Sequence, residues 1–238
     1  MLGWTFGESQ AEFGYHTQAH ANGKAAAAGS PPMPGEESNP SSWCLYLASR
    51  DTAATVAKVR ENGGEALMEP MEVGAFGTMA LARDPGGAVF GIWQANAHEG
   101  FDTEMGAPGG YCWAEVLTRD AKAVDAFYPA VFPYEEQKMD EASMDFAVFQ
   151  DRGQPVLGRM VMDSGFPPEV PSYVNVYFAV PDCDAVARTT ERGGALHFGP
   201  VDSPFGRFAV LGDPQGAAFA VIDVTTTQGG MPDMSPMA

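Results

Sequence analysis

Three segments share one pattern of apolar and polar positions, in which an apolar run ends at an aspartate. They are WCLYLASRD at 43–51, YCWAEVLTRD at 111–120 and YVNVYFAVPD at 173–182. An aspartate at this place can accept hydrogen bonds from the free N–H groups that open a helix. The pattern therefore predicts a strand followed by a helix three times, with helices over 51–62, 120–131 and 182–192.

Each helix should be followed by three strands, which in the first half lie at 65–73, 77–83 and 88–94. Paired glycines at 63–64 and 193–194 end two of the helices, and the Asp84-Pro85-Gly86-Gly87 run supplies the last hairpin turn. Each unit thus has the order βαβββ. The last strands are almost unbroken apolar runs, so we expect them to be buried, with Phe90, Ile92, Phe219 and Val221 facing helices.

The chain also repeats itself at a spacing of about 130 residues, which indicates two related modules. Asp51 matches Asp182, Phe76-Gly77 matches Phe205-Gly206, and Asp84-Pro85 matches Asp213-Pro214. We expect a first module at 1–95, a linker at 96–110, a second module at 111–224 and a disordered tail at 225–238.

The strand and helix of 111–130 have no counterpart in the first module. A misplaced start or a truncated chain is the expected cause, and a natural fold without this element is the alternative. The loss would leave the first module with an unpaired sheet edge and an uncovered face.

The net charge of the chain limits the kinds of molecule that it can bind. The 31 acidic residues against 13 basic ones give a formal net charge of -18, which repels phosphate backbones and anionic lipid surfaces. No apolar run has the length of a membrane span, and the N-terminus has no signal-peptide pattern. These features favour a cytoplasmic protein that binds neither nucleic acid nor membranes. The three cysteines are far apart and indicate neither a disulfide framework nor a redox motif.

The segments FGTMALARDPGGAVFGIWQ (76–94), EVLTRDAKAVDAFYPAVF (115–132) and FGRFAVLGDPQGAAFAVIDV (205–224) resemble the vicinal-oxygen-chelate superfamily of glyoxalase, bleomycin-resistance and dioxygenase type. More narrowly, the chain is similar to actinobacterial two-module glyoxalase-like proteins. The resemblance implies an α+β fold in which paired βαβββ modules form cupped mixed sheets with helices outside. It leaves the chemistry open, because this superfamily includes lyases, isomerases, dioxygenases, thiol transferases and drug binders.

In metal-using members of this superfamily the ligands come from the first and last strands of the units. The matching first-strand positions hold Cys44, Trp113 and Asn175, and the matching last-strand positions hold Gly91 and Ala220. Glycine and alanine have no side-chain donor atom, so we expect no family-type metal site and no cofactor. Two other candidates, His16 and His20, would lie about 13 Å apart on one strand face, too far for one ion.

Strand alternation predicts which residues share the concave face with these positions. They are Cys44, Tyr46, Gly91, Trp93, Trp113, Glu115, Asn175 and Tyr177. This set, rich in aromatic side chains, suits a planar, largely apolar ligand, although the rings could instead fill the sheet interior. Glu115 is the acid on this face and a candidate general acid or base, or else a carboxylate at the rim or paired with an arginine.

The leading hypothesis is a metal-independent protein that binds a small aromatic or polyketide-like molecule for sequestration, resistance or biosynthetic tailoring. The alternative is a tailoring enzyme of lyase, isomerase or hydroxylase type that uses Glu115 with Tyr46 or Tyr177, or a metal enzyme with unusual ligands. A third reading is a structural or interaction module with a filled interior. The expected partners are a small-molecule ligand and a second copy of the chain in a homodimer.

Overall fold

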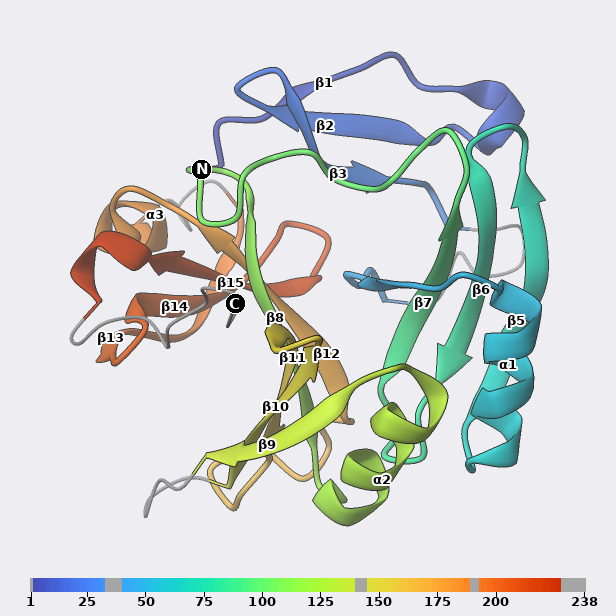
Figure 1. Cartoon of the computed structure of the whole chain (residues 1–238). Helices are drawn as coiled ribbons and strands as arrows, with labels where there is room; N and C mark the ends of the chain where they lie inside the picture. Colours follow the sequence, from blue (N-terminus) through green and yellow to red (C-terminus); the bar gives the residue numbers. More distant parts are fainter. Residues whose placement is uncertain (1, 33–39, 140–144, 189–192, 228–238) are drawn as a thin grey trace. The chain divides into compact units, whose positions relative to one another are not determined.

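A computed structural model describes residues 2–32, 40–139, 145–188 and 193–227. The chain divides into two compact units. Their helices and strands are labelled in Figure 1. Unit 1 combines the described residues of 1–43, 100–112 and 176–233, and unit 2 combines those of 44–99 and 113–175. Each unit therefore joins segments from both sequence modules. The expected division into modules 1–95 and 111–224 describes the repeat in the sequence, and its use as a division into domains stays a prediction.

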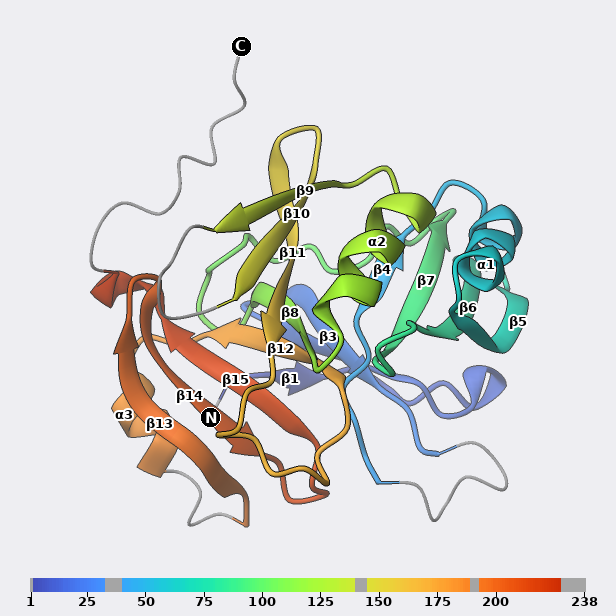
Figure 2. The same cartoon turned by 90° about the horizontal axis from the view of Figure 1, so that it is seen from below.

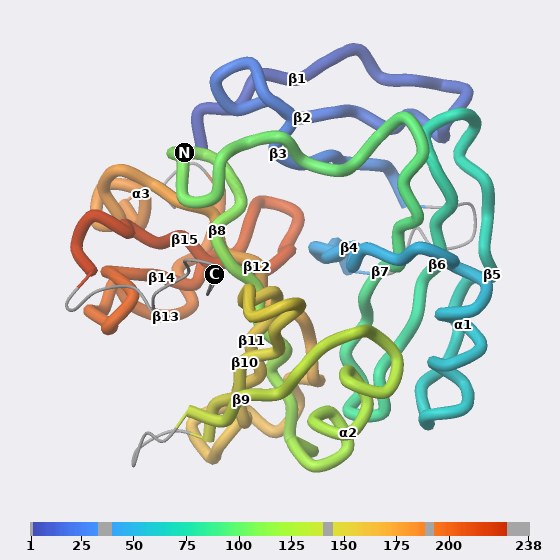
Figure 3. The backbone as a smooth tube through the Cα atoms, viewed as in Figure 1, coloured from blue at the N-terminus to red at the C-terminus, as the bar shows by residue number. Residues whose placement is uncertain are grey.

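Unit 2 contains two βαβββ segments. The first is β4 (Tyr46–Ala48), α1 (Thr52–Glu61), β5 (Glu65–Val73), β6 (Gly77–Arg83) and β7 (Val89–Ala95). The second is β8 (Tyr111–Thr118), α2 (Ala121–Val131), β9 (Glu135–Met139), β10 (Phe146–Asp151) and β11 (Gln154–Val161), with the first two residues of β8 assigned to unit 1. The tube in Figure 3 follows the chain from α2 into β9 and back through β10 and β11.

Unit 1 contains a third such segment and a smaller sheet. The segment is β12 (Tyr173–Ala179), α3 (Cys183–Ala187), β13 (Ala195–Ser203), β14 (Gly206–Gly212) and β15 (Ala218–Asp223), with the first three residues of β12 assigned to unit 2. Figure 2 shows α3 beside β13, β14 and β15. The smaller sheet consists of β1 (Thr5–Phe6), β2 (Thr17–Ala21) and β3 (Lys24–Gly29). A 3-10 turn at Ala11–Phe13 lies between β1 and β2.

All three segments have the same strand order, which confirms the α+β fold. The orders are β4-β7-β6-β5, β8-β11-β10-β9 and β12-β15-β14-β13, and in each the first strand pairs in parallel with the last. The other neighbours are antiparallel.

Aspartates cap all three helices, as the pattern predicts. Asp51, Asp120 and Asp182 accept hydrogen bonds from the backbone N–H groups of Ala54, Ala123 and Ala185 at 2.9, 3.0 and 2.8 Å. The third helix is described only over Cys183–Ala187, and residues 189–192 of its expected span lie outside the described residues. A 3-10 turn capped by Asp223, Val224–Thr226, spans the boundary between the second module and the expected tail, and 228–238 lie outside the described residues.

Helix α2 covers one face of the unit 2 sheets. Phe90 of β7 is fully buried against Phe127, Tyr128 and Phe132, with ring centroids 5.8–6.1 Å apart. This confirms the predicted orientation of Phe90. Tyr128 also donates a hydrogen bond to buried Asp84 in the β6–β7 turn at 3.2 Å.

Phe219, the counterpart of Phe90 in unit 1, has different aromatic neighbours. Its ring lies 6.0 Å from Trp43 and 6.2 Å from Phe178, and Trp4 lies 5.1 Å from Phe178. The prediction that Phe219 faces a helix therefore missed this contact, because two tryptophans outside any helix pack at this place. No helix in the described part of the chain is long and apolar enough to cross a membrane.

Candidate functional site

The face of unit 2 opposite α2 carries two of the predicted site residues, Trp113 and Glu115. On β10 and β11, Phe149 and Arg159 point toward α2, where they contact Tyr128 and Asp125. Because side chains alternate along a strand, the neighbouring Gly158 faces the other way. Gly158 is the register partner of Glu115 on β8, so Trp113, two residues earlier on the same strand, shares this face.

Because Gly158 has no side chain, neighbouring side chains fill the space beside its Cα. A Cβ atom at this position would lie 3.0 Å from Glu115 Cβ, 3.0 Å from Phe146 Cζ and 3.1 Å from Trp113 Nε1. The indole of Trp113 therefore lies over the glycine. We call Trp113, Glu115, Phe146, Val148, Gly158 and Met160 the β8–β11 face.

The β8–β11 face is mainly apolar and partly open. Trp113, Phe146, Val148 and Met160 are half-buried, whereas Glu115 is only 6% exposed. A partly open row of aromatic, sulfur-containing and aliphatic side chains can cover the flat side of a planar molecule. The buried carboxyl is the one ionisable group on this face.

A second aromatic residue lies over a glycine on the other sheet of unit 2. Tyr46 of β4 pairs with Gly91 of β7, and a Cβ atom at Gly91 would come within 2.3–2.6 Å of three atoms of the Tyr46 ring. Real Cβ contacts are never this short, so the ring occupies the place into which a side chain at position 91 would project. Tyr46 is itself 41% exposed.

Cys44 lies two residues before β4 and Trp93 lies on β7 of the same sheet as Tyr46, and each has its own contacts. Burial raises the pKa of the Cys44 thiol to about 12, which keeps it protonated at neutral pH. Trp93 donates its indole N–H to the carbonyl oxygen of His98 at 2.8 Å, and its ring lies over Gly77. Trp93 is therefore held by the protein itself.

The remaining predicted residues, Asn175 and Tyr177, lie on β12 but belong to different units. Asn175 belongs to unit 2 and is 1% exposed, and its side-chain oxygen Oδ1 has no hydrogen-bond partner. Tyr177 belongs to unit 1, where its ring lies 6.2 Å from Phe208. Tyr173, which the sequence reasoning missed, lies two residues before Asn175 and interacts electrostatically with Glu115.

The hairpin registers also identify two last-strand positions that the sequence left unassigned. In β10–β11 the register shifts between Phe149 and Gln150, and in β2–β3 it shifts at the matching place between Ala19 and His20. Gly158 pairs with Glu115 as Gly91 pairs with Tyr46 and as Ala220 pairs with Tyr177, so it is the last-strand position of its segment. The matching register shift makes Ala28 the equivalent residue of β3. All four last-strand positions are small, namely Ala28, Gly91, Gly158 and Ala220.

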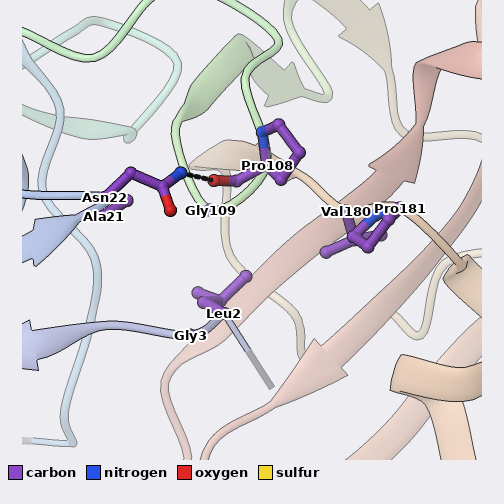
Figure 4. Close-up of a pocket in the computed structure, with 8 residues that line it drawn as sticks. All are labelled: Leu2, Gly3, Ala21, Asn22, Pro108, Gly109, Val180 and Pro181. Atoms are coloured by element: carbon purple, nitrogen blue, oxygen red, sulfur yellow. Dashed lines mark hydrogen bonds between the residues drawn. The ribbon is translucent and has the colours of Figure 1, made fainter.

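A separate hollow of about 200 Å³ lies within unit 1 (Figure 4). It is lined by Leu2, Gly3, Ala21, Asn22, Pro108, Gly109, Val180 and Pro181. The amide of Asn22 donates to the carbonyl oxygen of Pro108 across it at 3.5 Å, at the limit of a hydrogen bond. None of the predicted site residues lines this hollow.

The sequence and the fold of the chain can be compared with those of known proteins. No family model matches the chain. It is 38% identical over 228 residues to the glyoxylase-like protein CFP32 of Mycobacterium tuberculosis, covering 93% of this chain and 86% of that protein. It is also 34% identical over 238 residues to the anthracycline biosynthesis protein DnrV of Streptomyces peucetius, covering 94% of this chain and 86% of that protein.

The chain belongs to the vicinal-oxygen-chelate superfamily. The fold agrees: a Mn(II)-bound glyoxalase from Novosphingobium aromaticivorans superimposes with a TM-score of 0.55 at 15% identity, covering 94% of this chain and 78% of that one.

The residues at this superfamily's ligand positions do not fit a metal ion. All the last-strand positions lack a side-chain donor and Trp113 offers only an indole, so among these positions only Cys44 and Asn175 carry an atom that could bind a metal. Among the described residues, no three His, Cys, Asp or Glu side chains come together in a way that could hold a metal. The Tyr46 ring also fills the place from which a ligand at position 91 would reach.

Proposed function

We propose that this protein is a metal-independent member of the superfamily that binds a small planar aromatic or polyketide-like molecule on the β8–β11 face. The observation that carries the proposal is the Trp113 indole lying over Gly158 in a partly open apolar row. An aromatic side chain over a glycine leaves a flat surface on which a second ring system can stack.

The relatives support this choice of ligand class. DnrV is named for anthracycline biosynthesis, and an anthracycline is a polycyclic aromatic compound. We propose biosynthetic tailoring, sequestration or resistance as the setting in which such a molecule is bound.

Binding can be tested by titrating the protein with planar aromatic compounds and following tryptophan fluorescence. Saturable quenching is expected, and Trp113→Ala should weaken binding by about 1–3 kcal/mol, the scale of one large apolar contact. Trp43→Ala is the matched control, because Trp43 packs in the aromatic cluster of unit 1, and its loss should leave the affinity unchanged. If no compound gives saturable quenching, the rings are a filled interior and the proposal fails.

A second candidate function, acid–base catalysis, rests on the burial of Glu115. A carboxyl that is 6% exposed beside an indole ring is shielded from water and can exchange a proton with a bound ligand. Glu115→Gln separates the two functions. Loss of product formation with binding retained would favour the enzyme, whereas unchanged behaviour would favour the binding protein.

A further inference from the structure

Asn175 presents a buried hydrogen-bond acceptor that the protein does not use. Its side chain is 1% exposed, and Oδ1 has no hydrogen-bond partner in the described structure. A buried polar atom without a partner lowers stability, so such atoms are rare in folded proteins. Unpaired acceptors of this kind are expected where a ligand supplies the missing donor.

The acceptor lies on the face of β12 that carries Tyr173, a residue near Glu115 of the β8–β11 face. Side chains alternate along a strand, so Tyr173 and Asn175 project from one face of β12 and Val174 and Val176 from the other. Tyr173 is close enough to Glu115 for the carboxyl charge to raise the pKa of its phenol, an effect added to that of burial. Strand β12 also neighbours β8 in the sheet order. The apolar surface at Trp113 therefore has a polar border formed by Glu115, Tyr173 and Asn175.

The chemistry of this border specifies the ligand. Tyr173 keeps its proton at neutral pH, because both burial and the nearby carboxyl raise its pKa. It can therefore donate a hydrogen bond to a ligand oxygen. Asn175 Oδ1 can only accept one. A ligand that fits both the apolar surface and this acceptor must carry a free O–H or N–H group at its edge.

We infer that Asn175 is a specificity-determining residue that accepts a hydrogen bond from a hydroxyl group on a planar aromatic ligand, so that hydroxylated polycyclic compounds are selected over their O-methylated or unsubstituted analogues. The inference rests on the proposed function of the β8–β11 face. It adds a substrate class, the phenols, and a residue that distinguishes them.

The test compares 2-hydroxyanthraquinone with 2-methoxyanthraquinone, at a pH below the pKa of the free phenol. The first has a hydroxyl that can donate and the second does not. Wild type should bind the hydroxy compound about tenfold more tightly, the effect of one hydrogen bond to a buried acceptor. Asn175→Leu, which has a similar size and no acceptor, should bind the two compounds within about twofold of each other while keeping its affinity for the methoxy compound.

Two further variants make the result specific. Asn175→Thr keeps an acceptor oxygen and suits a strand, so it should retain the preference for the hydroxy compound, and it also serves if the leucine variant does not fold. Asn96→Leu, at an exposed position of unit 2, is the matched control and should behave as wild type. Equal binding of the two compounds by wild type, or a preference that survives in Asn175→Leu, would overturn the inference. If neither compound binds at all, the proposed function fails instead.

Discussion

The contact of Tyr46 with Gly91 can be tested by adding one methyl group. In Gly91→Ala the new Cβ would fall within 2.3–2.6 Å of the Tyr46 ring, so the ring must rotate away or the strands must separate. The Gly91 backbone adopts a conformation open to any residue, so the whole cost is steric. Overpacking of this kind costs about 1–3 kcal/mol.

The assay is chemical denaturation of wild type, Gly91→Ala, Tyr46→Ala and the double variant. Because Tyr46 is 41% exposed, its truncation alone should cost less than Gly91→Ala, and in the double variant the methyl group should become nearly neutral. Gly29→Ala is the control, since a Cβ there meets nothing within 4 Å and should change stability by less than about 0.5 kcal/mol. If Gly91→Ala is harmless, or if the two changes are additive, the ring does not occupy this place.

Three other predictions concern the framework of unit 2. Phe90→Ala should lower the free energy of unfolding by about 3–5 kcal/mol, because the ring is fully buried against α2, and a loss below about 1 kcal/mol in denaturation would contradict that packing. Asp125→Asn should lower the free energy of unfolding by about 3–5 kcal/mol, because it breaks the ion pair with buried Arg159. Asp145→Asn should lower it less, because the Asp145 carboxyl is 62% exposed. Equal losses in the two variants would show that Asp125 is not the more buried partner of Arg159. Burial raises the pKa of Asp84, so the folded protein binds this proton more readily than the unfolded chain, and the carboxyl's contribution to stability is lost as the pH rises through the raised pKa. Unfolding measured from acid to neutral pH should therefore show wild type losing stability relative to Asp84→Asn as the pH rises, and a constant difference would contradict this.

The local elements followed from the sequence because their signals are local. Asp51, Asp120 and Asp182 cap helices through their own side chains, and the apolar run at 88–94 forms a strand between a tight turn and a change to polar residues. Trp113 and Glu115 followed from strand alternation once the family resemblance had supplied the ligand positions, and they share a face in the structure.

Pairing over long distances did not follow from the sequence. Similarity between repeats does not show which repeat packs against which, so the combination of 44–99 with 113–175 in one unit could not be predicted from the repeat. Gly158 was missed because the turn at 151–154 lacks the Asp-Pro-x-Gly run that marks the last strand in the two other segments. Tyr173 was missed because its importance depends on the nearby charge of Glu115, which belongs to another strand. The homodimer and the cytoplasmic location stay predictions.

The most direct test of the account is calorimetric titration of 2-hydroxyanthraquinone into the purified protein before and after treatment with EDTA, with the metal content measured in both samples. A metal-independent ligand site should give saturable binding with the same Kd in the two samples, and well under one equivalent of Zn, Ni, Fe or Mn in either. A stoichiometric metal whose removal abolishes binding would contradict it.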